Sequence, residues 1–194
     1  MEKLSYALGM SIAANLQQSG VAEIDVDAFA RGLKHHIEGT TTEINQQEAG
    51  KIINDFFAAV QNKQYEANMK AGQDFLAENA KKEGIVTLES GLQYEILNEG
   101  NGAKPNAADN VKCHYHGTLI DGTVFDSSVE RGEPATFPVN GVIPGWVIAL
   151  QLMNVGSKWR LFIPSDLAYA EHGAGQQIPP HTTLIFEVEL LDIV

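Results

Sequence analysis

Cysteine is almost absent from this chain of 194 residues, because Cys113 is the only one. A single cysteine excludes an intrachain disulfide framework and is compatible with a reducing compartment. Basic residues are also scarce: 13 Lys and Arg stand against 25 Asp and Glu, which gives a formal net charge of −12. Such an acidic chain is a poor partner for nucleic acid or for anionic membranes.

Long apolar runs are missing as well, since none approaches the ~20 residues that a membrane span requires. The stretch from Leu4 to Leu16 is moderately apolar, but Glu2 precedes it and Ser11 and Asn15 interrupt it. It is not followed by the small-residue cleavage site of a signal peptide. We therefore expect a cytoplasmic location rather than a periplasmic one, and no membrane partner.

Proline is missing from the first half of the chain, and this absence divides the sequence. All seven prolines, from Pro105 onward, and both tryptophans lie after Gly84. Before Gly84 the apolar residues follow helical spacing, and after it turn residues separate short β-type runs. The sequence predicts a helical domain over residues 1–83 and a second domain over residues 84–194.

Helical spacing is regular near the N-terminus, where we expect a first helix to end at Gly20. Asp25 is suited to cap a second helix, which would end at Gly39. A third, long helix is expected over about residues 45–83, with a polar and solvated second half. Aliphatic residues four positions apart form one stripe on the first helix: Leu4, Leu8, Ile12 and Leu16.

Three helices of this size bury little apolar surface by themselves. We therefore expect a homodimer in which the apolar stripes of two chains pack together. The alternative is that the stripes fold back on the second domain. The residues expected in the dimer contacts are Leu4, Leu8, Ile12, Leu16, Phe29, Leu33, Ile52 and Phe56.

Alternating apolar residues predict β-strands in the second domain. In one of them Cys113 and Tyr115 share a face, and His114 and His116 lie on the other. Asp121-Gly122 predicts a hairpin turn. The expected strands are residues 92–97, 111–119, 159–163 and 184–190.

One short helical stretch, residues 147–153, follows Trp146. An antiparallel sheet with a single helix packed on it is an α+β domain. The fold class expected for the whole chain is therefore α+β, with an all-α domain in front.

Reactive groups are few in this second domain. His114 and His116 could supply half of a metal site, but no third ligand has suitable spacing, so no metal is expected. No phosphate-binding loop is present, and no cofactor is expected. A serine hydrolase using the pair Ser127-Ser128 with His172 or His181 stays open as an alternative, although the Gly-x-Ser-x-Gly elbow is absent.

The stretch from Tyr115 to Trp146 combines aromatic residues and turn glycines with Asp126. These residue types predict a shallow pocket with aromatic walls and few polar groups. Such a pocket suits an apolar ligand and has little equipment for hydrolysis or group transfer.

Five segments closely resemble the FKBP-type peptidyl-prolyl cis-trans isomerases, in order and with compatible spacing over about residues 90–194. The helical half resembles the bacterial two-domain dimeric members, of the FklB and macrophage-infectivity-potentiator-like type. The resemblance implies a half-barrel sheet wrapped on one short helix. The segments are Tyr115-x-Gly117, Gly122-x-x-Phe125-Asp126-Ser127-Ser128, Val142-Ile143-Pro144-Gly145-Trp146, Ala168-Tyr169 and Ile178-Pro179-Pro180-His181-x-Thr183-Leu184-x-Phe186.

The resemblance also implies a site, with Trp146 as the pocket floor. The backbone N–H of Ile143 and the hydroxyl of Tyr169 would donate to ligand carbonyls. The implied catalytic residues are Asp126, Tyr169, Trp146 and Phe125. The residues implied in binding substrates or macrolides are Tyr115, Phe125, Asp126, Arg131, Phe137, Val142, Ile143, Trp146, Tyr169, Ile178 and Phe186.

The implied activity is isomerisation of X–Pro bonds in unfolded or partly folded polypeptides, which assists protein folding. Rotation about a peptide bond faces a barrier of ~18–20 kcal/mol, and an apolar pocket favours the twisted amide because it is less charge-separated. Macrolides such as tacrolimus and rapamycin are implied ligands, and a homodimer through the N-terminal helices is implied as well. The alternative is a binding chaperone, or holdase, in which the pocket is secondary.

Overall fold

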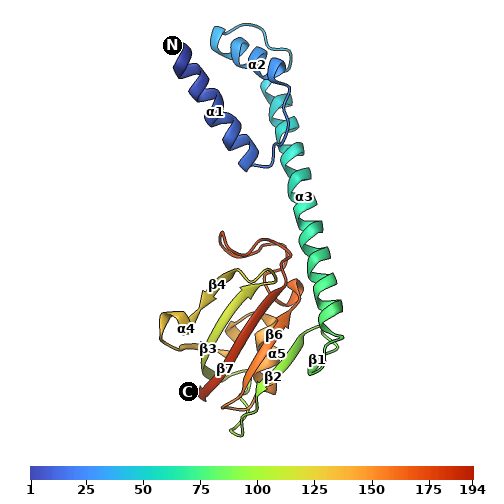
Figure 1. Cartoon of the computed structure of the whole chain (residues 1–194), viewed down its shortest axis with the longest axis vertical. Coiled ribbons are helices and arrows are strands. Elements are labelled where there is room, and N and C mark those ends of the chain that lie inside the picture. Colours follow the sequence, from blue (N-terminus) through green and yellow to red (C-terminus); the bar gives the residue numbers. More distant parts are fainter. The chain divides into compact units, whose positions relative to one another are not determined.

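The computed structural model describes all residues, Met1–Val194. They form two compact units, Met1–Lys63 and Gln64–Val194, which we call the helical unit and the sheet unit. The boundary falls inside a long helix, α3, which belongs to both (Figure 1). No helix combines the length and the apolar character that crossing a membrane requires.

The second helix begins and ends at the residues that the sequence indicated, whereas the first ends at Gln18, two residues before the expected Gly20. The Asp25 side chain accepts a hydrogen bond from the Ala28 N–H at 2.9 Å, which caps the second helix. Gly39 ends that helix in the left-handed conformation, with φ of 65°. The long helix ends at Asn79 rather than at residue 83. The bounds are α1 Glu2–Gln18, α2 Val26–Glu38 and α3 Gln46–Asn79.

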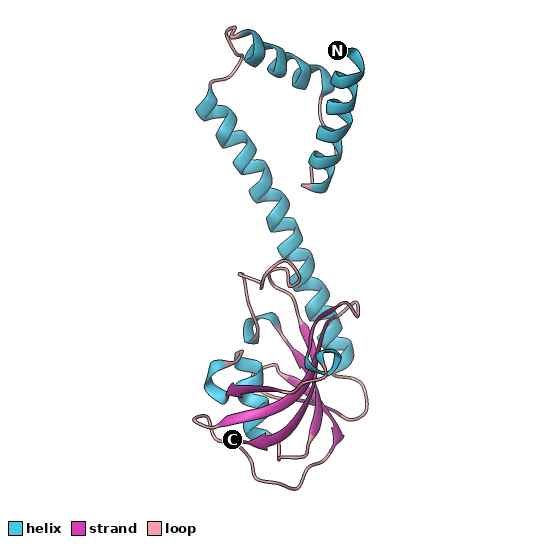
Figure 2. Cartoon of the chain, turned by 90° about the vertical axis from the view of Figure 1, so that its left-hand side faces the viewer, coloured by secondary structure: helices cyan, strands magenta, loops and turns pink.

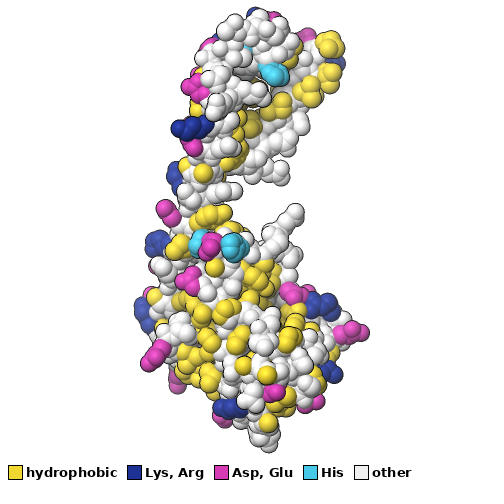
Figure 3. Space-filling model, turned by 180° about the vertical axis from the view of Figure 1, so that it is seen from behind, with side chains coloured by type: hydrophobic (Ala, Val, Ile, Leu, Met, Phe, Trp, Pro, Cys, Tyr) yellow, Lys and Arg dark blue, Asp and Glu magenta, His cyan; other side chains and the backbone are white.

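The helical unit leaves most of its apolar side chains exposed. No residue of α1 or α2 is buried, and Leu4 and Leu8 expose 56% and 54% of their surface. Hydrophobic side chains, yellow in Figure 3, are therefore visible over this unit. The unit has no enclosed apolar core of its own within one chain.

The sheet unit is built on one antiparallel sheet with strand order β1-β2-β6-β7-β3-β4, and β5 pairs with β3. Three of these strands, β1, β4 and β5, are short and were not predicted as strands. Asp121-Gly122 makes the turn between β3 and β4, where the Gly122 N–H donates to the Leu119 carbonyl at 3.0 Å. The bounds are β1 Ile85–Thr87, β2 Gln93–Asn98, β3 Asn110–Leu119, β4 Val124–Ser127, β5 Ala135–Pro138, β6 Lys158–Ile163 and β7 Leu184–Ile193.

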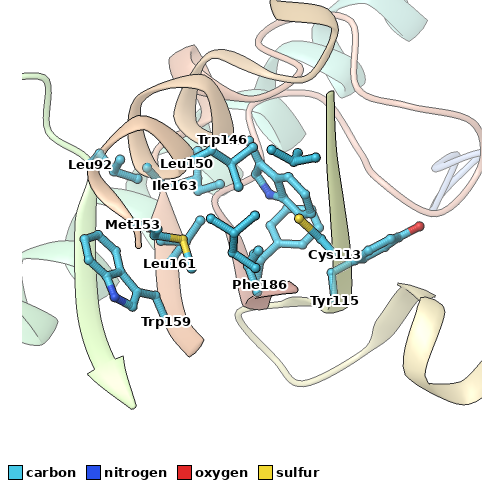
Figure 4. Packing of buried hydrophobic residues seen from close by; sticks show 14 of the residues in the cluster. Leu92, Cys113, Tyr115, Trp146, Leu150, Met153, Trp159, Leu161, Ile163 and Phe186 are labelled. Carbon is cyan, nitrogen blue, oxygen red and sulfur yellow. The ribbon is translucent and has the colours of Figure 1, made fainter. Parts of the chain in front are cut away.

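A short helix, α5 (Pro144–Leu152), packs on one face of the sheet and closes the core (Figure 2). Trp146 and Leu150 of this helix meet strand residues such as Leu161 (Figure 4). The fold class is confirmed: an α+β unit with an antiparallel sheet and one short helix on it. Shorter helical turns lie at α4 Ser128–Arg131, η1 Val139–Gly141 and η2 Ser165–Leu167.

The second half of α3 packs on the sheet within the sheet unit, so the expectation that it is solvated is wrong for one face. The Phe75 ring lies 6.0 Å from the Phe162 ring, measured between centroids. The buried Asn79 amide donates to the Gln93 side chain at 3.0 Å, and Gln93 donates to the Leu76 carbonyl at 2.9 Å. These contacts fix the end of α3 to β2 and β6.

Candidate active site

The sheet unit contains a cavity of about 580 Å³ between β3, β4, the start of α5 and the loop that follows η2. All residues implied in ligand binding line it except Arg131, which contacts two of them. The structure thus brings these side chains together, and their role in binding stays a prediction. The lining residues are Tyr115, Phe125, Asp126, Phe137, Gly141, Val142, Ile143, Trp146, Tyr169, Ala174, Gly175, Gln177, Ile178 and Phe186.

Trp146 forms the floor, held by three aromatic neighbours. It stands nearly perpendicular to Tyr115 and Phe186, with ring centroids 5.5 Å and 5.3 Å away. Phe137 makes a similar edge contact at 5.8 Å. Edge-to-face packing of this kind is favourable beyond the apolar area that it buries. Trp146 is only 4% exposed, so the indole is locked in place before any ligand arrives.

Gly117 explains how Phe125 reaches this cluster. A Cβ atom at position 117 would lie 2.7 Å from the Phe125 ring and 2.8 Å from the Phe186 ring. Only glycine therefore leaves room for Phe125 to stand edge-on against Phe186, with centroids 5.3 Å apart. The spacing of Tyr115 and Gly117 on β3 thus places one aromatic wall and makes space for the next.

Asp126 and Tyr115 share a hydrogen-bonded cluster with Arg131 at the edge of the cavity. The Tyr115 hydroxyl donates to Asp126 Oδ2 at 2.6 Å and accepts from Arg131 Nη2 at 2.7 Å. Arg131 also pairs with the Asp126 carboxylate. In Figure 4 the Tyr115 hydroxyl points away from the apolar core.

This cluster shifts the pKa values of its members in opposite directions. Partial burial opposes ionisation of Asp126, but hydrogen bonds from Tyr115 and Arg131 outweigh it, so its pKa lies below the ordinary value. Partial burial and the bond to Asp126 raise the pKa of Tyr115. At neutral pH the wall therefore presents an ionised carboxylate beside a neutral phenol.

Two polar hydrogens on the cavity wall have no acceptor within the protein. Ile143 is the residue before α5, and its carbonyl accepts from the Trp146 N–H, whereas its own N–H makes no backbone hydrogen bond. Tyr169 is 37% exposed, and burial, with the nearby charge of Asp126, raises the pKa of its hydroxyl. Both groups can donate to carbonyl oxygens of a bound ligand.

The structure gives Ser127 and Ser128 structural partners. Ser128 is fully buried: its hydroxyl accepts from the Tyr115 N–H at 2.8 Å and donates to the Tyr115 carbonyl at 3.2 Å. His114 Nδ1 lies 3.0 Å from the same oxygen, and His116 Nδ1 lies 3.0 Å from Ser127 Oγ. Neither serine lines the cavity, so the hydrolase alternative has no accessible nucleophile here.

Four lining residues were not among the predicted site residues. Gly141 precedes Val142, and the others belong to the loop between Tyr169 and Ile178. Small and polar loop residues carry no periodic signal, so only their position between two predicted wall residues could have indicated them. The four are Gly141, Ala174, Gly175 and Gln177.

Comparison with known proteins places this geometry in a family. The profile of the FKBP-type peptidyl-prolyl cis-trans isomerases matches residues 101–191. The profile of the domain amino terminal to such isomerases matches residues 1–96. The two matches together span both units of the chain.

Individual relatives are similar over nearly the whole chain. The FKBP-type 22 kDa peptidyl-prolyl cis-trans isomerase of Escherichia coli (strain K12) is 49% identical over 98% of this chain and 94% of that protein. The outer membrane protein MIP of Legionella longbeachae is 43% identical over 99% of this chain and 85% of that protein. Because this relative is named an outer membrane protein, the comparisons do not support the expected cytoplasmic location.

A solved structure agrees with the sequence matches. The crystal structure of FkpA from Escherichia coli superimposes with a TM-score of 0.79 at 35% identity, over 98% of this chain and 95% of that chain. The aromatic cavity therefore lies in a unit whose fold and sequence both match one family. The chain belongs to the FKBP-type peptidyl-prolyl cis-trans isomerases.

Proposed function

We propose that the chain isomerises X–Pro peptide bonds by holding a twisted amide in the aromatic cavity over Trp146. The observation that supports this most directly is the cavity itself, with its preset aromatic floor and walls. Uncatalysed X–Pro isomerisation takes tens to hundreds of seconds, because rotation must break amide resonance. The reaction breaks no covalent bond, so binding and orientation are the contributions that these residues can make.

The apolar walls favour the transition state through solvation. A planar amide is charge-separated and well hydrated, whereas the twisted amide is less polar and loses less on leaving water. Trp146 and Phe186 would contact the proline ring. The Ile143 N–H and the Tyr169 hydroxyl would fix the carbonyls on either side, which confines rotation to one bond. Asp126 would lie beside the twisted carbonyl, held in its ionised form by Tyr115 and Arg131.

A pair of tryptophan substitutions tests this proposal. Trp146→Leu removes the floor, and we expect kcat/KM on an Xaa-Pro tetrapeptide to fall by about tenfold or more, equivalent to ~1.4 kcal/mol. Trp159→Leu is the matched control, because Trp159 is also buried but stacks on Tyr94 outside the cavity. Full activity of Trp146→Leu would refute the pocket assignment.

We also propose that the chain is a homodimer through the helical unit. Phe29, Leu33 and Phe56 remain 40%, 49% and 43% exposed in the single chain. Apolar patches of this kind on a soluble protein mark interaction surfaces. Sedimentation of the purified protein should give the mass of two chains, and Leu8→Glu should give one. Gln17→Glu, an exposed polar position on the same helix, is the control.

The same exposed side chains would suit a holdase that binds unfolded chains. The test compares the full chain with residues 64–194 on two substrates. Equal activity on a tetrapeptide, together with loss of activity on an unfolded protein, would support a holding role for the helical unit. Equal activity on both substrates would assign the function to the cavity alone.

Two narrower expectations are part of this proposal. Tacrolimus or rapamycin would compete with peptide for the cavity, and calorimetric titration should lose its signal in Trp146→Leu.

A cytoplasmic location has the single cysteine in its favour, and the name of the Legionella relative stands against it. Cell fractionation decides between the two compartments, because recovery with periplasmic or membrane markers would contradict a cytoplasmic location.

A further inference from the structure

One face of α3, from Tyr65 to Asn79, is buried or half-buried against the sheet unit. Its residues are three or four positions apart, as one helix face requires. Half of them are polar or small, so the face carries only a weak hydrophobic signal. Its members are Tyr65, Asn68, Gly72, Phe75, Leu76 and Asn79.

Asn68 makes a specific polar contact from this face. Its Nδ2 donates to the carbonyl of Pro180 at 2.8 Å. Its Oδ1 accepts from Gln64 Nε2 at 2.9 Å, which orients the amide so that the nitrogen faces Pro180. The half-buried side chain thus joins α3 to a residue 112 positions later in the chain.

Two neighbours of Asn68 bring α3 close to the same segment. The Tyr65 ring meets the His181 ring edge-on, with centroids 5.4 Å apart. At Gly72 a Cβ atom would lie 2.3 Å from Thr183 Oγ1 and 3.2 Å from Thr183 Cβ. The absence of a side chain at Gly72 therefore allows the helix to approach Thr183.

The segment that α3 contacts continues directly into the cavity wall. The His181 N–H donates to the Ala170 carbonyl at 2.7 Å, next to Tyr169. Ala174 and Ile178 exchange backbone hydrogen bonds of 2.8 Å and 3.1 Å. Tyr169, Ala174 and Ile178 all line the cavity. Residues 169–183 therefore form one loop, with the cavity on one side and α3 on the other.

The backbone of this loop is held in an unfavourable conformation. Ala170 and His181, which are joined by the hydrogen bond from the His181 N–H to the Ala170 carbonyl, have φ values of 46° and 57°. Residues with a Cβ seldom adopt the left-handed region, and surrounding contacts must compensate for the strain. The Pro180 contact to Asn68 lies immediately beside His181, where such support acts most directly.

We infer that Asn68 is a positioning residue for the active site: by holding Pro180 it fixes the loop that presents Ile178 and Tyr169 to substrate. The inference rests on the proposed isomerase function. Asn68 touches no substrate, and it acts through the loop. Ile178 and Tyr169 would contact the substrate both before and during rotation of the peptide bond. Loosening them therefore weakens substrate binding more than it lowers the rate of isomerisation in the bound complex.

The test compares two asparagines of α3 in the full chain. Asn68→Asp keeps the shape of the side chain but removes the donor to Pro180. Asn62→Asp introduces the same charge at an exposed position of the same helix. We expect Asn68→Asp to raise KM for an Xaa-Pro peptide by about three- to tenfold, as loss of one hydrogen bond allows, with kcat changed less than about twofold. Asn62→Asp should match the wild type.

The δ-methyl NMR signal of Ile178 gives a readout without catalysis. It should shift or broaden in Asn68→Asp only. A wild-type protein without isomerase activity would refute the proposed function, and the methyl signal would still report on the loop. An active wild type with identical KM and methyl signals in both variants would overturn the positioning role.

A second pair of variants approaches the same contact from the packing side. Gly72→Ala should push α3 away from Thr183 and raise KM in the same direction as Asn68→Asp. Adding Thr183→Ala removes the oxygen that lies 2.3 Å from the new methyl group and should restore KM. A double variant no better than Gly72→Ala would count against coupling between α3 and the loop.

Discussion

Large apolar side chains are buried in the sheet unit and largely exposed in the helical unit. In the sheet unit Val111, Leu161 and Leu190 are fully buried, whereas Leu8 and Ile37 of the helical unit expose 54% and 73% of their surface. Buried apolar surface contributes roughly 25 cal/mol per Å², so the sheet unit is stabilised by its own core. The helical unit has the elements of a fold without the burial that would stabilise it. Helix formation and core formation are therefore separate requirements.

Truncation within α3 should destabilise the sheet unit strongly. A fragment of residues 84–194 lacks the face of α3, whereas residues 64–194 retain it. The half-buried Phe75 and Leu76 together contribute about 2 kcal/mol, and the bonds of Gln93 to α3 add about 1 kcal/mol each. We expect the shorter fragment to lose about 3–5 kcal/mol of unfolding free energy, measured in urea. Equal midpoints would show that α3 adds nothing to the sheet unit.

The next effect compares leucines of the two units. Leu150→Ala, at a fully buried position, should lower the unfolding free energy of the sheet unit by about 2–5 kcal/mol. Leu8→Ala should leave the sheet unit unchanged and weaken association of the helical unit. Unfolding followed at several protein concentrations separates the two outcomes, because only association depends on concentration. A Leu8→Ala protein with a destabilised sheet unit would show that the core of the sheet unit depends on the helical unit.

Sequence patterns predicted the long strands and both ends of the second helix. Alternation placed Cys113 and Tyr115 on the buried face of β3, and Asp25 and Gly39 have strong cap signals. The short strands β1, β4 and β5 were not predicted, because three or four residues are too few to show a hydrophobic period. Their pairing depends on partners that are distant in sequence.

The cavity could be predicted largely because its wall residues are aromatic and lie in recognisable motifs. The contacts by which α3 supports the cavity wall from behind could not be predicted. Through Asn68, Gly72 and Asn79, α3 contacts the rest of the sheet unit. Because these side chains are polar or small, the sequence pattern predicts a solvated surface. Only the fold shows that Asn68 faces Pro180 and that Gly72 faces Thr183.

A smaller effect is expected from pH, and it acts through the cluster at the cavity edge. The pKa of Asp126 is lowered, so its contribution to stability is present above the unfolded pKa of ~3.9 and is lost as pH falls through the lower folded value. The pKa of Tyr115 is raised, so its contribution is present below ~10 and is lost above it.

Between these limits, from about pH 5 to pH 9, both contributions are fully present, so this cluster should give stability and isomerase activity no dependence on pH. Asp126→Asn should abolish the part of the stability loss at low pH that comes from protonation of the carboxylate. Tyr115→Phe should abolish the part of the loss at high pH that comes from ionisation of the phenol. Thermal unfolding across pH measures both. A wild-type transition near neutral pH that disappears in either variant would contradict the assigned direction of the shifts.

The smallest effect separates the two faces of α3 itself. Lys70 pairs with Asp74 at 2.6 Å, but both side chains are largely exposed, at 74% and 64%. An exposed pair at i and i+4 contributes about 0.3–0.5 kcal/mol. Lys70→Ala should therefore lower the unfolding free energy of residues 64–194 by no more than that, and 1 M salt should remove the difference, because exposed charges are screened. Phe75→Ala, five residues further along on the inner face, should cost several times more. Equal costs would mean that the two faces of α3 do not differ as their burial indicates.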